Sequence, residues 1–162
     1  FERRLALDPN SDEAYYYAGL SYKEMKQLPE AIAALRKGAE LAPTKSDRFF
    51  WLGVTLVQAD SIDASDEAFT QVTAIDSTGR NRALACQQLG FHQLLKKNWD
   101  DAVRFLECAA SNDDKNVGTL VWLGQAYQNS GNKGKAIETY RKVLQLQPGQ
   151  PDATKGLKML GS

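Results

Sequence analysis

The chain has 162 residues, of which 43% are hydrophobic, and its 20 Lys and Arg residues balance its 20 Asp and Glu residues. Zero net charge argues against a nucleic-acid binder that works by neutralising phosphates. No apolar run approaches the roughly 20 residues that cross a bilayer, so we expect no membrane insertion by this segment.

Two sets of small residues recur along the chain in one register. The glycines stand 34, 37 and 34 residues apart, and a second small residue follows each glycine by twelve positions. Small residues let two helices approach closely at the same point of each unit, so the pattern predicts a repeated helix pair. The two sets are Gly19, Gly53, Gly90 and Gly124, and Ala31, Ser65, Ala102 and Ala136.

The register divides the chain into segments, which we take as one domain and as a fragment of a longer array. Apolar residues at three- and four-residue steps predict two helices of about 13 residues in each full repeat. Residues 1–11 are expected to end a preceding repeat, and residues 151–162 to form a capping helix or the first helix of a truncated fifth repeat. The four repeats between them are 12–45, 46–79, 83–116 and 117–150.

Local signals mark the helix boundaries inside the repeats. Ser61, Asn98 and Asn132 stand just before second helices, where a side-chain oxygen can cap free backbone N–H groups. Pro29 stands at the opening of the second helix in the first repeat, where a missing N–H costs nothing. Gly131 suits the helix-ending turn of the fourth repeat.

The repeats resemble the tetratricopeptide repeat. The resemblance is carried by Tyr15-x-x-Ala18-Gly19-x-x-Tyr22 with Ala31 and Leu35, and by Leu120-x-x-Leu123-Gly124-x-x-Tyr127 with Ala136 and Tyr140. It covers nearly the whole chain. It implies an all-α fold, a right-handed αα superhelix (a tetratricopeptide-repeat solenoid) of four repeats with a partial N-terminal helix and a C-terminal capping helix.

Two features depart from a regular array. Between the second and third repeats stand three extra residues, Arg80 to Arg82, which a longer loop or an extended helix would absorb. The two cysteines, Cys86 and Cys108, fit neither a disulfide framework nor a zinc site by their number and spacing. We expect them to be buried or half-buried thiols.

The sequence offers no constellation for catalysis. The single histidine, His92, has no paired acid or metal ligand in the pattern, and Asp100 and Asp101 suit the positive end of a helix. There is no glycine-rich phosphate loop and no nucleophile elbow. We therefore expect no enzyme, no cofactor and no metal site.

The resemblance implies that the first helices of the repeats line a concave groove for a partner. The middle of this set is apolar, and a large exposed apolar patch on a protein marks an interaction site. The competing interpretation is that some of these residues only pack between neighbouring helices. The predicted partner-binding residues are Tyr16, Tyr17, Leu20, Phe50, Trp51, Val54, Val57, Phe91, Leu94, Leu95, Val121, Trp122 and Gln125.

One known ligand class of the family is excluded by the residues at its binding positions. The clamp for acidic C-terminal tails of chaperones needs Lys, Arg and Asn side chains, because it holds two carboxylates. This chain has Tyr16, Leu20, Trp51, Leu84 and Gln88 at those positions.

The function implied is a protein–protein interaction scaffold that binds an apolar or amphipathic helix, or an extended peptide, in its groove. Two alternatives stay open. The chain can stack head to tail into homo-oligomers, since residues 1–81 hold 9 Lys and Arg against 13 Asp and Glu, and residues 82–162 hold 11 against 7. It can also be a regulatory appendage of a larger enzyme or secretion component. Partner identity and compartment stay undetermined.

Overall fold

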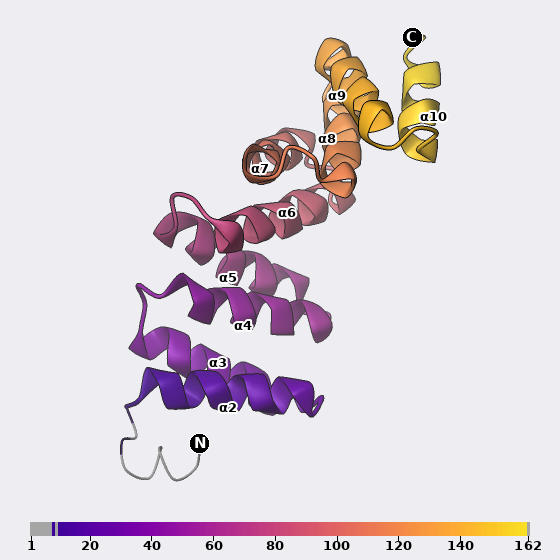
Figure 1. Ribbon diagram of the computed structural model, residues 1–162. Helices are drawn as coiled ribbons and strands as arrows, with labels where there is room; N and C mark the ends of the chain where they lie inside the picture. The colour runs from indigo at the N-terminus through magenta and orange to yellow at the C-terminus, as the bar shows by residue number, and fades with distance from the viewer. Residues whose placement is uncertain (1–7, 9, 162) are drawn as a thin grey trace. The chain divides into compact units, whose positions relative to one another are not determined.

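The structure, a computed structural model, describes residue 8 and residues 10–161 (Figure 1). These residues form nine helices and no strand, which confirms the predicted all-α fold. They fall into two compact units that divide between Ser77 and Thr78. Of the segment predicted to end a preceding repeat, residues 1–7 and Pro9 lie outside the described residues.

The first unit consists of two antiparallel helix pairs, α2 with α3 and α4 with α5 (Figure 1). The second helix of the first pair, α3, also packs on α4. Its core includes a cluster of Leu35, Leu52, Leu56 and Ala68. The helices are α2 (Asp12–Glu24), α3 (Leu28–Leu41), α4 (Ser46–Gln58) and α5 (Ile62–Ile75).

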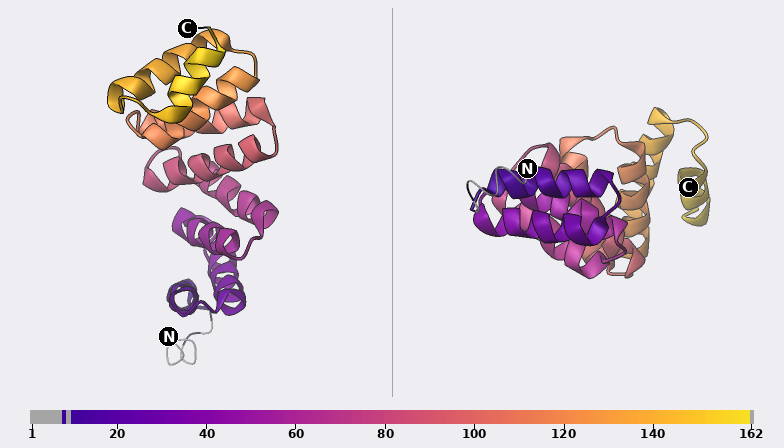
Figure 2. Two further views of the ribbon diagram at one scale, coloured as in Figure 1. Left: turned by 90° about the vertical axis from the view of Figure 1, so that its right-hand side faces the viewer. Right: turned by 90° about the horizontal axis from the view of Figure 1, so that it is seen from below.

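The second unit repeats this arrangement with α6 and α7, then α8 and α9, and adds α10. In sequence and in packing α10 follows α9 as a further first helix, and it packs against both α9 and α8 (Figure 2). Its Ala153 is fully buried. The helices are α6 (Arg80–Leu95), α7 (Trp99–Asn112), α8 (Val117–Asn129), α9 (Lys133–Leu146) and α10 (Pro151–Met159).

The small-residue register is the packing device of both units. The four second-helix residues Ala31, Ser65, Ala102 and Ala136 are all 0% exposed. At each of the four glycines an added Cβ would meet one large side chain of the paired second helix. It would lie 2.5 Å from Leu35 Cγ at Gly19 and 2.8 Å from Phe69 Cε1 at Gly53. The glycines therefore admit the large residues that fill the core.

The irregular 37-residue step is absorbed by helix α6. This helix has 16 residues, whereas α2, α4 and α8 have 13 each. It begins at Arg80, directly after Gly79, whose φ of 100° is open to glycine. Of the two expected solutions, the extended helix is the one the chain adopts.

The turn inside each repeat uses a left-handed residue at one fixed place. Lys26, Asp60, Lys97 and Gly131 occupy this place and have φ of 60°, 57°, 59° and 84°. Only the fourth repeat has glycine there, so the other three bear the roughly 1–2 kcal/mol that this conformation costs a residue with a side chain. Gly131 was predicted from the sequence and its three counterparts were not, because Lys and Asp residues usually have a negative φ.

The predicted N-cap residues occupy the cap positions, but they do not all act through their side chains. Ser61, Asn98 and Asn132 are the N-cap residues of α5, α7 and α9. Only Asn132 accepts a hydrogen bond there, from the Lys135 backbone N–H at 3.3 Å. The Asn98 amide instead donates to Gln93 Oε1 at 2.8 Å.

The prediction of two free thiols is wrong. Cys86 on α6 and Cys108 on α7 form a disulfide, with their Cα atoms 5.9 Å apart. The two cysteines are 22 residues apart, so one lies on the first helix of the repeat and the other at the facing position of the second helix. A spacing rule for small disulfide-rich or zinc-binding motifs misses this, because the helix pair and not the local sequence brings the two residues together.

Candidate functional site

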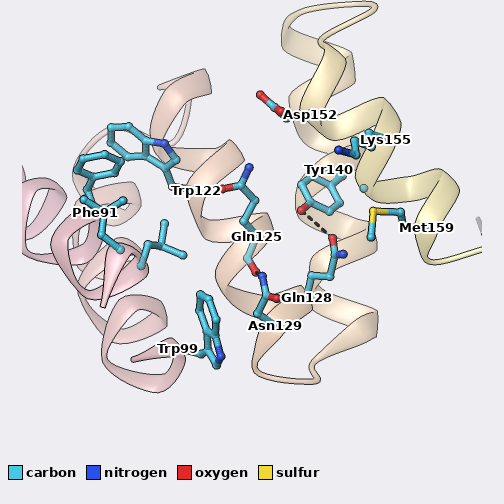
Figure 3. A pocket seen from close by; sticks show the side chains of 13 residues that line it. Phe91, Trp99, Trp122, Gln125, Gln128, Asn129, Tyr140, Asp152, Lys155 and Met159 are labelled. Atoms are coloured by element: carbon cyan, nitrogen blue, oxygen red, sulfur yellow. Dashed lines mark hydrogen bonds between the residues drawn. The ribbon is translucent and has the colours of Figure 1, made fainter. Parts of the chain in front are cut away.

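The second unit has a pocket of about 420 Å³ bounded by first helices and by α10 (Figure 3). Helix α6 forms one wall and α8 the floor, and α10 closes the opposite side. Single residues from α7 and α9 complete the lining. The residues are Phe91, Leu94, Leu95, Trp99, Trp122, Gln125, Gln128, Asn129, Tyr140, Asp152, Lys155, Gly156 and Met159.

Aromatic rings form the apolar part of this pocket. The rings of Phe91 and Trp122 lie 4.6 Å apart between centroids and are tilted by 32°. Trp99, the first residue of α7, lies apart from this pair, and Gln125 and Asn129 lie to one side of these rings (Figure 3). The pocket thus has two separate aromatic surfaces beside a group of amide side chains.

The polar part of the pocket is held in place by Tyr140. This buried tyrosine donates a hydrogen bond to Gln128 Oε1 at 3.0 Å (Figure 3). Burial, assisted by the negative charge of Asp152, raises the pKa of Tyr140 to about 12, so its hydroxyl stays protonated and remains a donor near neutral pH. The bond uses only the amide oxygen of Gln128 and does not involve its NH₂ group.

The first unit carries its own aromatic surface on α2 and α4. The Arg48 guanidinium lies 4.1 Å from the centre of the Tyr16 ring, and the Lys23 ammonium lies 5.3 Å from the Trp51 ring. Tyr16, Leu20 and Trp51 are partly buried against the core of this unit. Part of their surface therefore serves packing, as the competing interpretation holds.

Arg48 is the charged residue that organises this surface. It is 5% exposed, and its Nε and Nη2 donate to Asp12 Oδ2 at 3.0 and 2.7 Å. Its Nη1 donates to Asp47 Oδ2 at 2.6 Å. Lys45 adds a third donor group, 3.0 Å from Asp12 Oδ2.

This pairing predicts a loss of stability in acid. Hydrogen bonds from Lys45 and Arg48 hold the pKa of Asp12 below its usual value of 3.8. A carboxylate whose pKa is lowered by folding stabilises the folded state at neutral pH, and this contribution disappears as pH falls through the folded-state pKa. We expect the Asp12→Asn variant to be less stable than the wild type near neutral pH, with the difference shrinking in acid. Urea unfolding of both proteins, from neutral pH to below pH 3.8, measures this difference in the free energy of unfolding. A difference that stays constant over that range would contradict the role assigned to Asp12.

The predicted binding residues divide between the two units. Tyr16, Leu20, Phe50, Trp51, Val54 and Val57 in the first unit are half-buried, and Tyr17 is 55% exposed. In the second unit Phe91, Leu94, Leu95, Trp122 and Gln125 all line the pocket. Val121 does not, because it is 5% exposed and belongs to the core cluster of that unit. A single surface joining the two groups stays a prediction.

The far side of the pocket, formed by Trp99 and by residues of α10, was not predicted from the sequence. Trp99 opens a second helix, and the family pattern places ligand positions on first helices. Asp152, Lys155 and Met159 belong to α10, which was expected as a cap or as the first helix of a further repeat, without binding residues of its own. The signal was present, because α10 follows the fourth repeat in register and so occupies the place of a further first helix.

Comparison with known proteins identifies two of the repeats. Two models of the tetratricopeptide repeat match the chain, one at residues 13–43 and one at residues 117–150. These two segments are tetratricopeptide repeats. The matched segments coincide with the first and fourth predicted repeats, and the same helix-pair geometry occurs in the two repeats between them.

Similar proteins agree with this tetratricopeptide-repeat fold. Superkiller protein 3 of Schizosaccharomyces pombe is 24% identical over 91% of this chain, which spans 11% of that protein. The crystal structure of MamA superposes with a TM-score of 0.80 at 22% identity, covering 92% of this chain and 80% of that one. YrrB, described as a TPR protein with an unusual peptide-binding site, gives 0.77 at 23% identity, covering 97% and 79%.

The tetratricopeptide-repeat fold supports a protein–protein interaction scaffold as the general role of this chain. Within the described residues, no helix has the length and apolar character that a membrane crossing requires.

Proposed function

We propose that the chain binds a partner protein through a short peptide or helix seated in the pocket between α6, α8 and α10. The observation that carries the proposal is the convergence of aromatic, amide and aliphatic side chains from α6, α8 and α10 on one cavity. Two of its apolar residues, Leu95 and Met159, are each 66% exposed. Exposed apolar side chains beside a cavity supply the buried anchor contacts that dominate protein interfaces.

The surroundings of the pocket support a peptide rather than a small charged molecule. Its α6 and α8 walls carry no charged side chain, and Asp152 and Lys155 on α10 oppose each other in sign. The similarity of fold to YrrB, a TPR protein with a peptide-binding site, is consistent with this use of the groove.

Phe91→Glu is expected to weaken binding by roughly tenfold or more, or about 1.4 kcal/mol, because it puts a charge where an apolar anchor must be buried. Peptides selected from a display library against the whole chain supply the ligand, and isothermal titration measures the affinity. Gln145→Glu is the matched control, since it adds the same charge at an exposed position of α9. Equal affinity of both variants would contradict the proposal.

Self-association is a second candidate, favoured by the opposite net charges of residues 1–81 and 82–162. Attraction between opposite charges weakens as salt screens it. Light scattering at increasing protein concentration and at low and high salt tests this candidate, and a monomer under all conditions removes it.

A further inference from the structure

The pocket of the second unit presents hydrogen-bond donors that nothing in the described part of the chain uses. Within those residues, the indole N–H groups of Trp99 and Trp122 and the side-chain amide of Gln125 make no hydrogen bond. The Gln128 amide keeps its NH₂ group, because Tyr140 occupies only its oxygen. These donors lie around one cavity, together with flat aromatic rings (Figure 3).

An indole N–H can only donate, so a ligand that suits Trp99 and Trp122 must offer free acceptors. An α-helix uses its backbone carbonyls internally except in its last turn, so it would cover these donors and leave them unpaired. Covering a donor without giving it a partner costs about 1–3 kcal/mol. A helical ligand is therefore disfavoured by the polar half of the pocket, although it would suit the apolar half.

A polyproline II segment meets both halves. Its carbonyl groups make no internal hydrogen bonds, and proline has no backbone N–H, so it offers acceptors alone. Proline rings are compact and apolar, and they dock on aromatic side chains such as the tilted pair of Phe91 and Trp122. The segment is also extended before it binds, which reduces the entropy lost on binding.

We propose that the ligand of this pocket is a proline-rich, extended segment of a partner protein, with its carbonyl groups bonded by Trp99, Trp122 and Gln125. The proposal rests on the proposed function, since it names the ligand chemistry of the same pocket. The uncharged walls on α6 and α8 agree with it, because a proline-rich segment needs no charged partner.

Proton–nitrogen NMR of the indole groups tests the proposal with an internal reference. The chain has three tryptophans, and the third, Trp51, lies on α4 in the other compact unit. Decaproline added to the whole chain is expected to shift the indole N–H resonances of Trp99 and Trp122 and to leave that of Trp51 in place. Trp99→Phe and Trp122→Phe keep a ring and lose the donor, so each should weaken decaproline binding about fivefold, the effect of one hydrogen bond. Trp51→Phe should not change it.

The proposal is overturned if the indole resonances of Trp99 and Trp122 do not shift at millimolar decaproline. It is also overturned if a Gly-Ser decapeptide produces the same shifts. The proposed function stands or falls separately. If library-selected peptides without proline bind and lose affinity in Phe91→Glu, the pocket binds peptides but not this class. If no selected peptide depends on Phe91, the proposed function fails as well.

Discussion

Gly124→Ala is expected to lower the free energy of unfolding of the second unit by about 2 kcal/mol, the cost of overpacking less the better helix propensity of Ala. An added Cβ would lie 2.5 Å from Cε1 of Tyr140. The ring has no room to move away, because its opposite edge, at Cε2, lies so near Gly156 on α10 that a Cβ added there would also clash with it. Its hydroxyl is fixed by the hydrogen bond to Gln128. Urea unfolding followed by circular dichroism measures the loss.

The matched control for this prediction is Gly134→Ala. Gly134 also lies in a helix of the second unit, but a Cβ there would meet nothing within 4 Å. We expect this variant to be as stable as the wild type or more stable by up to about 1 kcal/mol. If both substitutions stabilise the unit equally, the close approach of Gly124 and Gly156 to the Tyr140 ring does not determine how the second unit packs.

Reduction of the disulfide between Cys86 and Cys108 is expected to cost the second unit about 3 kcal/mol. The bond closes a loop across a 22-residue separation, and a cross-link of this size removes that much chain entropy from the unfolded state. It also ties α6 to α7, the two helices that carry Phe91 and Trp99. Unfolding with and without a thiol reductant measures the difference.

The variant with both Cys86→Ala and Cys108→Ala controls for other effects of the reductant. It should be less stable than the oxidised wild type, and reductant should not change it further. Thiol titration of the folded, untreated chain gives an independent check. Two reactive thiols under oxidising conditions, with unchanged stability on reduction, would contradict the cross-link.

The fold was largely predictable because small residues report helix contacts directly. A glycine and, twelve residues later, an alanine or serine recur in register in all four repeats, and each pair marks one close approach between paired helices. The disulfide was not predictable in the same way. It depends on which faces of α6 and α7 meet, and Cys86 and Cys108 have no counterparts in the other repeats to reveal it.

The candidate site was predictable only in part. The family positions found the α6 and α8 walls, including Phe91 and Trp122, because each repeat contributes equivalent residues to one face. They misassigned Val121, which the closeness of the neighbouring helices buries in the core. They also missed Trp99 and Met159, which reach the pocket from a helix start and from the added helix α10. Such contributions depend on tertiary packing that periodicity does not encode.

The pocket as the binding site is tested most directly by site-specific photo-cross-linking. A benzophenone amino acid is placed at Gln125, on the floor of the pocket, or at Gln145, exposed on α9, and each chain is irradiated with a peptide selected from the library. Binding in the pocket predicts efficient cross-linking from position 125 and background levels from position 145. Cross-linking from position 145 alone, or equally from both positions, would contradict it.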